Sequence, residues 1–309
     1  MALIQPPMLT HGGTHPARAF RMMVRDLARG QQGVTEGNDL RVRQLPTAGP
    51  GVLVGDGSAV VRGAEWAQGS YTQYNVGDTN VPIVPGGAND RHDLLLLRIE
   101  DPEYDGNRNP AEDDVGYFHV IPGVSATTTT APAGMTAIPL ARIAVPANTY
   151  QITDGMITDL RQIANPRRER SLATAYPASL TELRYQDGVW RNWPPQASWQ
   201  VAVPPWATQM RAVVTIAGLR MDRANVYATM QVAFGALLGD DTVLDDDQGP
   251  GRRRTTAVIA HTLSVPSSMR GTTQTMRLQT MIGKTESGDL SVDGGTSIVA
   301  DVEWVEGRT

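Results

Sequence analysis

The stretch Arg91-His92-Asp93-Leu94-Leu95-Leu96-Leu97-Arg98-Ile99-Glu100 decides how the first half of the chain is interpreted. Side chains of a β-strand alternate between its two faces, so four consecutive leucines cannot lie on one face. The run is too short for a free-standing helix and is closed by Asp101-Pro102, which predicts a strand covered on both faces near its middle. After Leu97 the pattern alternates, with Ile99 inward. We therefore expect the central strand of a β-rich first domain.

The composition of the 309-residue chain favours β-structure. It has 31 glycines and 21 prolines, 40% hydrophobic and 19% charged residues, and a formal net charge of −5. Frequent turn residues with many Thr and Val predict short strands rather than helix bundles. The acidic balance argues against a nucleic-acid partner. The absence of cysteine excludes a disulfide framework. No apolar run approaches the length of a membrane span, so we expect no membrane insertion.

The pattern divides the chain into three parts. We expect a β-rich N-terminal domain with one short helix over residues 1–162, a linker and a β-hairpin over 163–197, and an antiparallel, jelly-roll-like β-sandwich over 198–309. The sandwich is expected to contain strands at 199–203, 209–216, 224–234, 255–263, 273–282 and 297–304.

Two Asp-Gly pairs predict hairpin turns, because this dipeptide supplies the residues with φ > 0 that tight hairpins need. The first is Asp56-Gly57. The second is Asp187-Gly188, which lies between the apolar-alternating segments 183–186 and 189–192. The second register sets Tyr185 opposite Trp190, a cross-strand aromatic pair.

The expected N-terminal helix begins near Pro16 and ends before Gly30. Its apolar residues lie on one face, and four arginines lie on another. A basic stripe can bind nucleic acid, but no aromatic residues are interleaved with it. A solvated face or an acidic protein partner is the better interpretation. The candidate docking residues are Arg18, Arg21, Arg25 and Arg29.

Aromatic residues gather near the predicted hairpin. Exposed tryptophans suit sugar stacking and protein interfaces. The alternative is that they pack the junction between hairpin and sandwich. The candidates for a glycan or protein interface are Trp190, Trp193, Trp199, Trp206 and Tyr185.

Motifs for catalysis or metal binding are weak. The histidines lack metal-ligand spacing, and no Gly-x-Ser-x-Gly elbow occurs. Asp245 and Asp247, in an aspartate-rich loop, are weak calcium candidates, but charge pairing with the arginines that follow is simpler. Asp301 and Glu303 are the carboxylates that a glycosidase would use. We expect no cofactor and no enzymatic activity.

Several motifs carry a family resemblance. They include Pro16-Ala17-Arg18-Ala19-Phe20-Arg21, Gly57-Ser58-Ala59-Val60-Val61-Arg62-Gly63, the leucine run, Ile157-Thr158-Asp159-Leu160-Arg161, Val203-Pro204-Pro205-Trp206-Ala207 and Val265-Pro266-Ser267-Ser268-Met269-Arg270-Gly271. Through them the chain resembles the minor tail proteins of actinobacterial tailed phages over nearly its whole length.

The resemblance implies a virion component of the tail tip or baseplate that is made as a soluble protein in the host cytoplasm. It also implies a homo-oligomer, and a trimer is the expected state. Its N-terminal domain would attach to other tail proteins, and its sandwich would face a host cell-wall glycan. The resemblance assigns no catalytic residue to this chain. The alternatives are a glycan-degrading tail enzyme and a purely structural hub without host contact.

Overall fold

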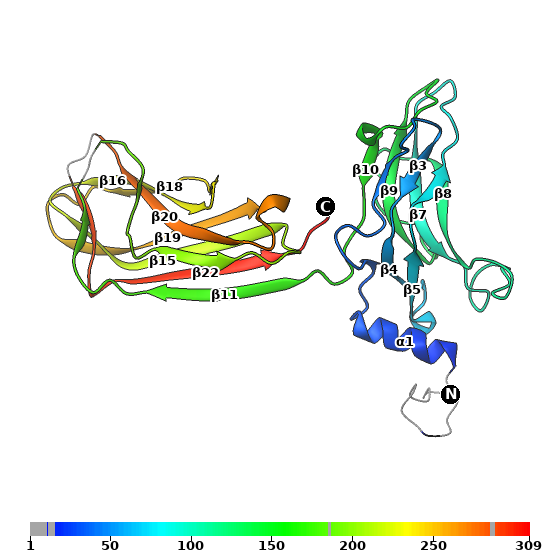
Figure 1. Cartoon of the computed structure of the whole chain (residues 1–309), viewed down its shortest axis with the longest axis horizontal. Helices are drawn as coiled ribbons and strands as arrows, with labels where there is room; N and C mark the ends of the chain where they lie inside the picture. Colours follow the sequence, from blue (N-terminus) through cyan, green and yellow to red (C-terminus); the bar gives the residue numbers. More distant parts are fainter. Residues whose placement is uncertain (1–10, 12–15, 185–186, 285–287) are drawn as a thin grey trace. The chain divides into compact units, whose positions relative to one another are not determined.

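The chain forms two compact β units. The computed structural model describes residues 11, 16–184, 187–284 and 288–309. One unit comprises Met1–Pro166 with Arg308–Thr309, and the other comprises Arg167–Gly307. The described part contains a single α-helix, α1 (Ala17–Leu27), and otherwise antiparallel sheets and short 3-10 turns (Figure 1). The expected fold class is therefore confirmed. Within these ranges, no helix has the length and apolar character that crossing a bilayer requires.

The N-terminal unit contains three antiparallel sheets. The first has the order β1 (Gly33–Val34), β4 (Gly57–Arg62), β5 (Ser70–Asn75), and the second has β2 (Val42–Gln44), β3 (Gly51–Val54), β6 (Thr79–Pro82). The third has β10 (Ile157–Asp159), β9 (Ala137–Val145), β7 (Arg91–Ile99), β8 (Gly116–Val124). Two 3-10 turns, η1 (Trp66–Gln68) and η2 (Asp154–Met156), complete the unit.

The leucine run forms the centre of β7 and is buried on both faces, as predicted. Leu94, Leu95, Leu96 and Leu97 are each at most 2% exposed. Leu95 and Leu97 belong to the main core of the unit, whereas Leu94 and Leu96 pack into a smaller cluster on the other face with Leu160. The strand thus separates two apolar layers, which explains why its sequence cannot alternate.

A buried arginine ties distant segments of this unit together. Arg161 is 1% exposed, and its guanidinium donates to the backbone oxygens of Gly37 and Asp39 at 3.1 and 2.7 Å. It also donates to the backbone oxygen of Thr309 at 3.2 Å and forms an ion pair with Asp159. Burial alone would raise the pKa of Asp159, but the hydrogen bonds and charge of Arg161 outweigh it and the pKa is lowered. The buried charge of Arg161 is thus compensated by Asp159 and by backbone oxygens.

The C-terminal unit is a sandwich of two antiparallel sheets. One has the order β11 (Arg168–Ala175), β22 (Ser297–Val305), β15 (Gln209–Asp222), β21 (Asp289–Val292), β12 (Thr181–Leu183), with β19 (Arg253–Ser264) also paired to β15. The other has β13 (Arg191–Asn192), β20 (Thr273–Ile282), β16 (Val226–Phe234), β17 (Leu237–Leu238), with β14 (Ser198–Ala202) on β20 and β18 (Thr242–Asp246) on β16. A 3-10 turn, η3 (Ser267–Met269), precedes β20.

The core of the sandwich lies between these sheets. Alternate residues of the long strands point inward, and the rings of Phe234 and Trp304, from opposite sheets, have their centroids 5.7 Å apart. All six strands predicted for this region are present, as β14, β15, β16, β19, β20 and β22.

The segment 163–197 differs from the expected linker and hairpin. Residues 168–175 form β11, an edge strand of the sandwich paired along its length with β22. β12 pairs with β21 in one sheet and β13 pairs with β20 in the other, so the two strands do not pair with each other. Asp187-Gly188 is therefore a corner between the sheets, and the predicted hairpin pairing is wrong. Tyr185 lies outside the described residues.

Candidate functional site

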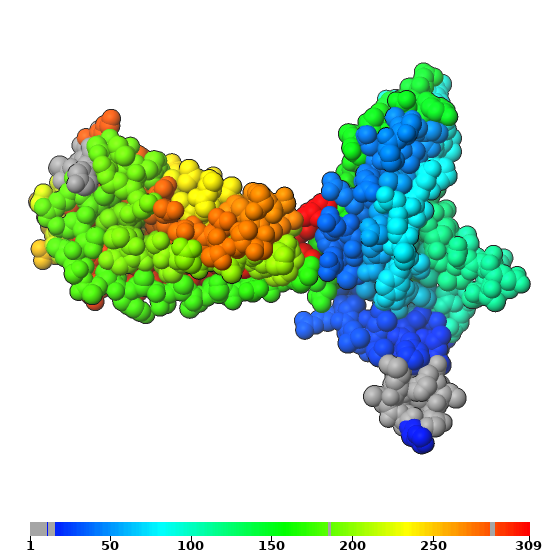
Figure 2. Space-filling model, viewed as in Figure 1, coloured from blue at the N-terminus to red at the C-terminus, as the bar shows by residue number. Residues whose placement is uncertain are grey.

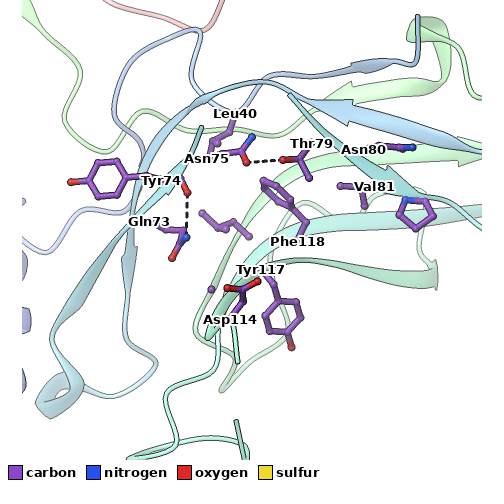
Figure 3. Close-up of a pocket in the computed structure, with 13 residues that line it drawn as sticks. Leu40, Gln73, Tyr74, Asn75, Thr79, Asn80, Val81, Asp114, Tyr117 and Phe118 are labelled. Atoms are coloured by element: carbon purple, nitrogen blue, oxygen red, sulfur yellow. Dashed lines mark hydrogen bonds between the residues drawn. The ribbon is translucent and has the colours of Figure 1, made fainter. Parts of the chain in front are cut away.

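The N-terminal unit has a cleft where the edges of its three sheets converge (Figure 3). One edge strand of each sheet lines the cleft. These strands are β5, β6 and β8. The cleft has a volume of about 450 Å³, which is in the range of ligand pockets. Because an edge strand pairs on one side only, such a cleft presents backbone groups as well as side chains.

Apolar side chains form the floor of the cleft. Leu40, Val81 and Leu97 are buried there, and the ring of Phe118 projects into the cleft (Figure 3). Leu40 has φ of 53°, a left-handed conformation that costs a non-glycine residue about 1–3 kcal/mol. Its N–H donates to the backbone oxygen of Asp56 at 3.0 Å. The surrounding structure thus holds a strained leucine in the floor.

The polar side chains of the rim are committed to the protein itself. Asn75 Nδ2 donates to three backbone oxygens at 2.9 to 3.3 Å, and Asn75 Oδ1 accepts from Thr79 Oγ1 at 2.7 Å. Gln73 Nε2 donates to the backbone oxygen of Tyr74 at 3.3 Å. Tyr74 is 65% exposed, and its ring points away from the cleft (Figure 3). These groups shape the rim and leave few side-chain donors for a ligand.

Tyr117, at the lower edge of the cleft in Figure 3, is held by charged neighbours. Its hydroxyl donates to Glu100 Oε2 at 2.8 Å, and the Arg108 guanidinium lies 4.0 Å from the ring centroid. Burial, followed by this hydrogen bond, raises the pKa of Tyr117, and the same bond is the main cause of the lowered pKa of Glu100. Tyr117 therefore stays protonated and fixed in place.

The backbone of β8 supplies the open hydrogen-bonding groups. Glu100 N–H donates to the oxygen of Val115 at 2.7 Å, which fixes the phase of the β7–β8 ladder. Bonded and non-bonded pairs alternate in an antiparallel ladder. The N–H and C=O groups of Gly116, Phe118 and Val120 consequently point away from β7, toward the free edge.

Gly116 allows the side chain of Gln73 to approach β8 closely. A Cβ at Gly116 would lie 2.1 Å from Oε1 of Gln73 on β5. Just before it, Asp114 alone among the described residues lining the cleft carries a formal charge. The electrostatic character of the cleft is therefore acidic.

Two of the four candidate docking arginines face the chain's own carboxylates. Arg21 forms ion pairs with Asp101 at 3.2 Å and Glu103 at 2.6 Å, and its guanidinium lies 5.4 Å from the Tyr71 ring centroid. Arg18 pairs with Glu103 as well. Burial would raise the pKa of Glu103, but the two guanidiniums outweigh it and the pKa is lowered. Both arginines are thus engaged within the unit, although 41% of the Arg18 side chain is exposed. Their role in docking stays a prediction.

The other two arginines remain on the surface. The Arg25 guanidinium lies 5.2 Å from the ring centroid of Trp66, a residue that is 66% exposed. Arg29 is exposed just after α1. Leu27, one of the apolar residues predicted to share a helix face, is 73% exposed. The helix thus turns Arg18 and Arg21 toward carboxylates of the unit, while Leu27 faces outward.

The tryptophan candidates lie mostly in the sandwich core. Trp193 is 4% exposed and belongs to that core, so its ring cannot stack on a sugar. Trp199 and Trp206 are half-buried and pack against the same core. Trp190 is half-buried outside it. Of the five candidates, Trp190 alone is described and separate from the core.

The aspartate-rich loop is largely strand. β18 ends at Asp246, which forms an ion pair with Arg253, as expected from charge pairing. Asp245 and Asp247 are exposed, and Asp247 Oδ1 accepts from Asn225 Nδ2 at 3.4 Å. No group of three metal-ligating side chains is present in the described part of the chain.

The two carboxylates of the glycosidase alternative lie on the outer face of β22. Asp301 pairs with Arg170, and this hydrogen bond is the main cause of its lowered pKa. Glu303 lies 3.6 Å from Arg168 and 3.2 Å from Arg211. Both carboxylates are held as charge partners of arginines.

The sequence interpretation did not identify the cleft. Its residues come from strands spread between positions 40 and 118 and meet only through the sheet edges. One local signal was available: the segment Tyr-Phe-His-Val-Ile of β8 carries no Asp, Glu, Lys or Arg and consists mostly of residues that favour strands.

Comparisons with known proteins give no family. No family model and no curated protein sequence matches the chain. Among solved structures, the VP2 subviral particle of infectious bursal disease virus is 11% identical, with a TM-score of 0.27 over 89% of this chain and 76% of that one. T=1 particles derived from the same virus give 11% identity and 0.26 over 93% and 84%.

A further match is the insecticidal delta-endotoxin Cry8Ea1 of Bacillus thuringiensis, 8% identical, with a TM-score of 0.21 over 90% of this chain and 55% of that one. TM-scores this low carry no argument about the role of the chain. Its function is therefore argued from its own residues.

Proposed function

We propose that the chain is a structural protein of a phage tail tip or baseplate, attached to neighbouring tail proteins through its N-terminal unit. The observation that carries the proposal is the cleft at three sheet edges, which offers strand edges and an apolar floor instead of catalytic groups. The motif resemblance to minor tail proteins supports the same assignment.

The C-terminal sandwich is the part that we propose to face the host envelope, with a cell-wall glycan as its partner. Trp190 is the aromatic candidate that remains outside the core. A trimer would strengthen weak single-site binding through avidity. The mass of the protein in solution tests this oligomer: a strict monomer, both free at micromolar concentration and in the particle, would exclude it.

Two experiments test the proposal. Imaging of purified particles with a label on this chain should place it at the tail tip, and its absence from particles would refute the assignment. Purified protein incubated with host envelope should be retained without releasing saccharide. Released saccharide would favour the enzyme alternative. If the protein is not retained and releases no saccharide, the structural hub is favoured.

A further inference from the structure

β8 is a sheet edge whose first six residues carry no protection. The strand is nine residues long and ends the order of its sheet. It has no Asp, Glu, Lys or Arg, and its one proline, Pro122, comes after the run Gly116–Ile121. Burial lowers the pKa of its one histidine, His119, which keeps that side chain neutral. Native proteins usually protect long edges with charges, prolines or a covering segment, because free N–H and C=O groups attract another strand.

Other long edges of the same chain do carry such protection. β11, the edge of one sandwich sheet, begins with Arg168, Glu169 and Arg170. β19, whose pairing among the described strands is with β15 alone, begins with Arg253 and Arg254. β8 instead begins with Gly116, Tyr117 and Phe118. The contrast indicates that the β8 edge is kept open for pairing.

We propose that the β8 edge takes up an extended segment of a neighbouring protein chain, which adds to the sheet as a further strand. The inference rests on the proposed function, in which that neighbour is another component of the tail. The outward N–H and C=O groups of Gly116, Phe118 and Val120 would bond to the added strand. Its alternate side chains would lie on the floor around Phe118 and Leu97.

The charges around the cleft restrict the sequence of this segment. Asp114 is a carboxylate at the end where β8 begins, and no basic residue is among the described residues that line the cleft. Nearby Arg108 is already bound to Glu100 and to the backbone oxygen of Asp114. The segment should therefore be uncharged along the floor, with a lysine or arginine beside Asp114. The polar insertion between β7 and β8 projects from the unit and leads directly into this end (Figure 2).

The side-chain inventory favours a peptide over a saccharide. A sugar needs convergent side-chain donors and acceptors, yet the amides of Gln73 and Asn75 and the hydroxyls of Thr79 and Tyr117 are bound internally. Strand addition needs only the backbone edge for affinity and side-chain pockets for specificity. The cleft offers both.

Hydrogen exchange tests the proposal on the full chain, free and in assembled particles. The amides of Gly116, Phe118 and Val120 should exchange at least about tenfold more slowly in the particle, since each gains or is shielded by a hydrogen bond. The amides of Tyr117 and His119, which point to β7, are the internal control and should be slow in both states. Equal exchange of the three outward amides in both states would overturn the proposal.

A second measurement uses defined probes on the free protein. A blocked peptide of about eight alternating valine and threonine residues, with lysine at one end, should bind at least about tenfold more tightly than the same peptide N-methylated at alternate positions. Asp114→Asn should remove any advantage of lysine over norleucine. Equal binding of both peptides, or binding of cellobiose or chitobiose in their place, would overturn it. A chain found in particles with unchanged exchange would leave the tail assignment intact and refute only the strand addition.

Discussion

Replacement of Leu96 by alanine tests the two-faced burial of β7. Leu96 is 0% exposed and packs with Leu94, Ala137 and Leu160 on the face away from the main core. Large-to-small changes at buried leucines cost about 2–5 kcal/mol, through lost transfer free energy and the cavity left behind. The cluster around Leu96 is small, so part of the cavity can collapse, and we expect about 2–3 kcal/mol. Leu95→Ala, in the larger core, should cost about 3–5 kcal/mol.

Calorimetry is the assay, because each unit has its own core and should give its own transition. For a unit of this size, a loss of about 3 kcal/mol lowers Tm by about 6–12 °C. Tryptophan fluorescence identifies the transition of the C-terminal unit. Of the six tryptophans, Trp66 lies in the N-terminal unit and the other five lie at position 190 or later. Leu27→Ala on α1, where the leucine is 73% exposed, is the matched control and should change Tm little. If Leu96→Ala lowers the free energy of unfolding no more than Leu27→Ala does, the face of β7 that carries Leu96 does not belong to a stabilising core.

Three further changes test the surrounding assignments. Arg21→Ala should destabilise the N-terminal unit by about 1–3 kcal/mol, because it removes the ion pair with half-buried Asp101 and the hydrogen bond to the backbone oxygen of buried Gln68. Arg29→Ala should change its Tm by little, and equal effects of the two changes would contradict the inward position of Arg21. Trp193→Ala should cost the sandwich about 3–5 kcal/mol, and unchanged Tm with weakened envelope binding would instead place that ring on the surface. Burial lowers the pKa of His261, whose Nδ1 accepts from Asp240 N–H at 2.9 Å, against the opposing charges of Asp240 and Asp241. As the pH falls below about 6.5, His261 of the unfolded chain binds a proton more readily than His261 of the folded chain. The stability of the sandwich should therefore decrease as the pH is lowered from about 6.5 toward 5. In a series of Tm measurements over this range, His261→Gln should show a weaker pH dependence.

The central strands were predictable because the local order of apolar residues reflects which faces of each strand are buried. The leucine run has an apolar residue at every position, and only a strand covered on both faces satisfies that arrangement. The long sandwich strands alternate, as Met210, Ala212, Val214 and Ile216 do on β15. In both cases the core imposes a periodicity that survives in the sequence.

β11 was missed for the opposite reason. It lies at an edge, and its first five residues, Arg168 through Leu172, are exposed. Its pairing is backbone hydrogen bonding to β22, which any residue except proline can supply. A strand held in this way has no apolar period, so its polar sequence resembles a linker.

The candidate site could not be predicted because it depends on contacts distant in sequence. The arginines of α1 were interpreted by their own spacing, but their orientation is decided by Asp101 and Glu103, more than 70 residues away. The cleft likewise exists only where three sheet edges meet. Its committed amides are equally invisible, since Asn75 looks available until its backbone partners are known.

The two Asp-Gly pairs show why local turn chemistry does not determine strand pairing. A type I′ hairpin turn requires φ > 0 at both central residues. Gly57 and Gly188 have φ of 139° and 70°, but Asp56 and Asp187 are not among the described residues with positive φ. Each glycine was thus correctly assigned a special conformation, but neither aspartate completes a type I′ turn. The strand that follows then pairs in another sheet: β4 with β5 and β1, and β13 with β20. A dipeptide can therefore specify that the chain turns, but the sheet that the next strand joins is decided by which edge is open to receive it.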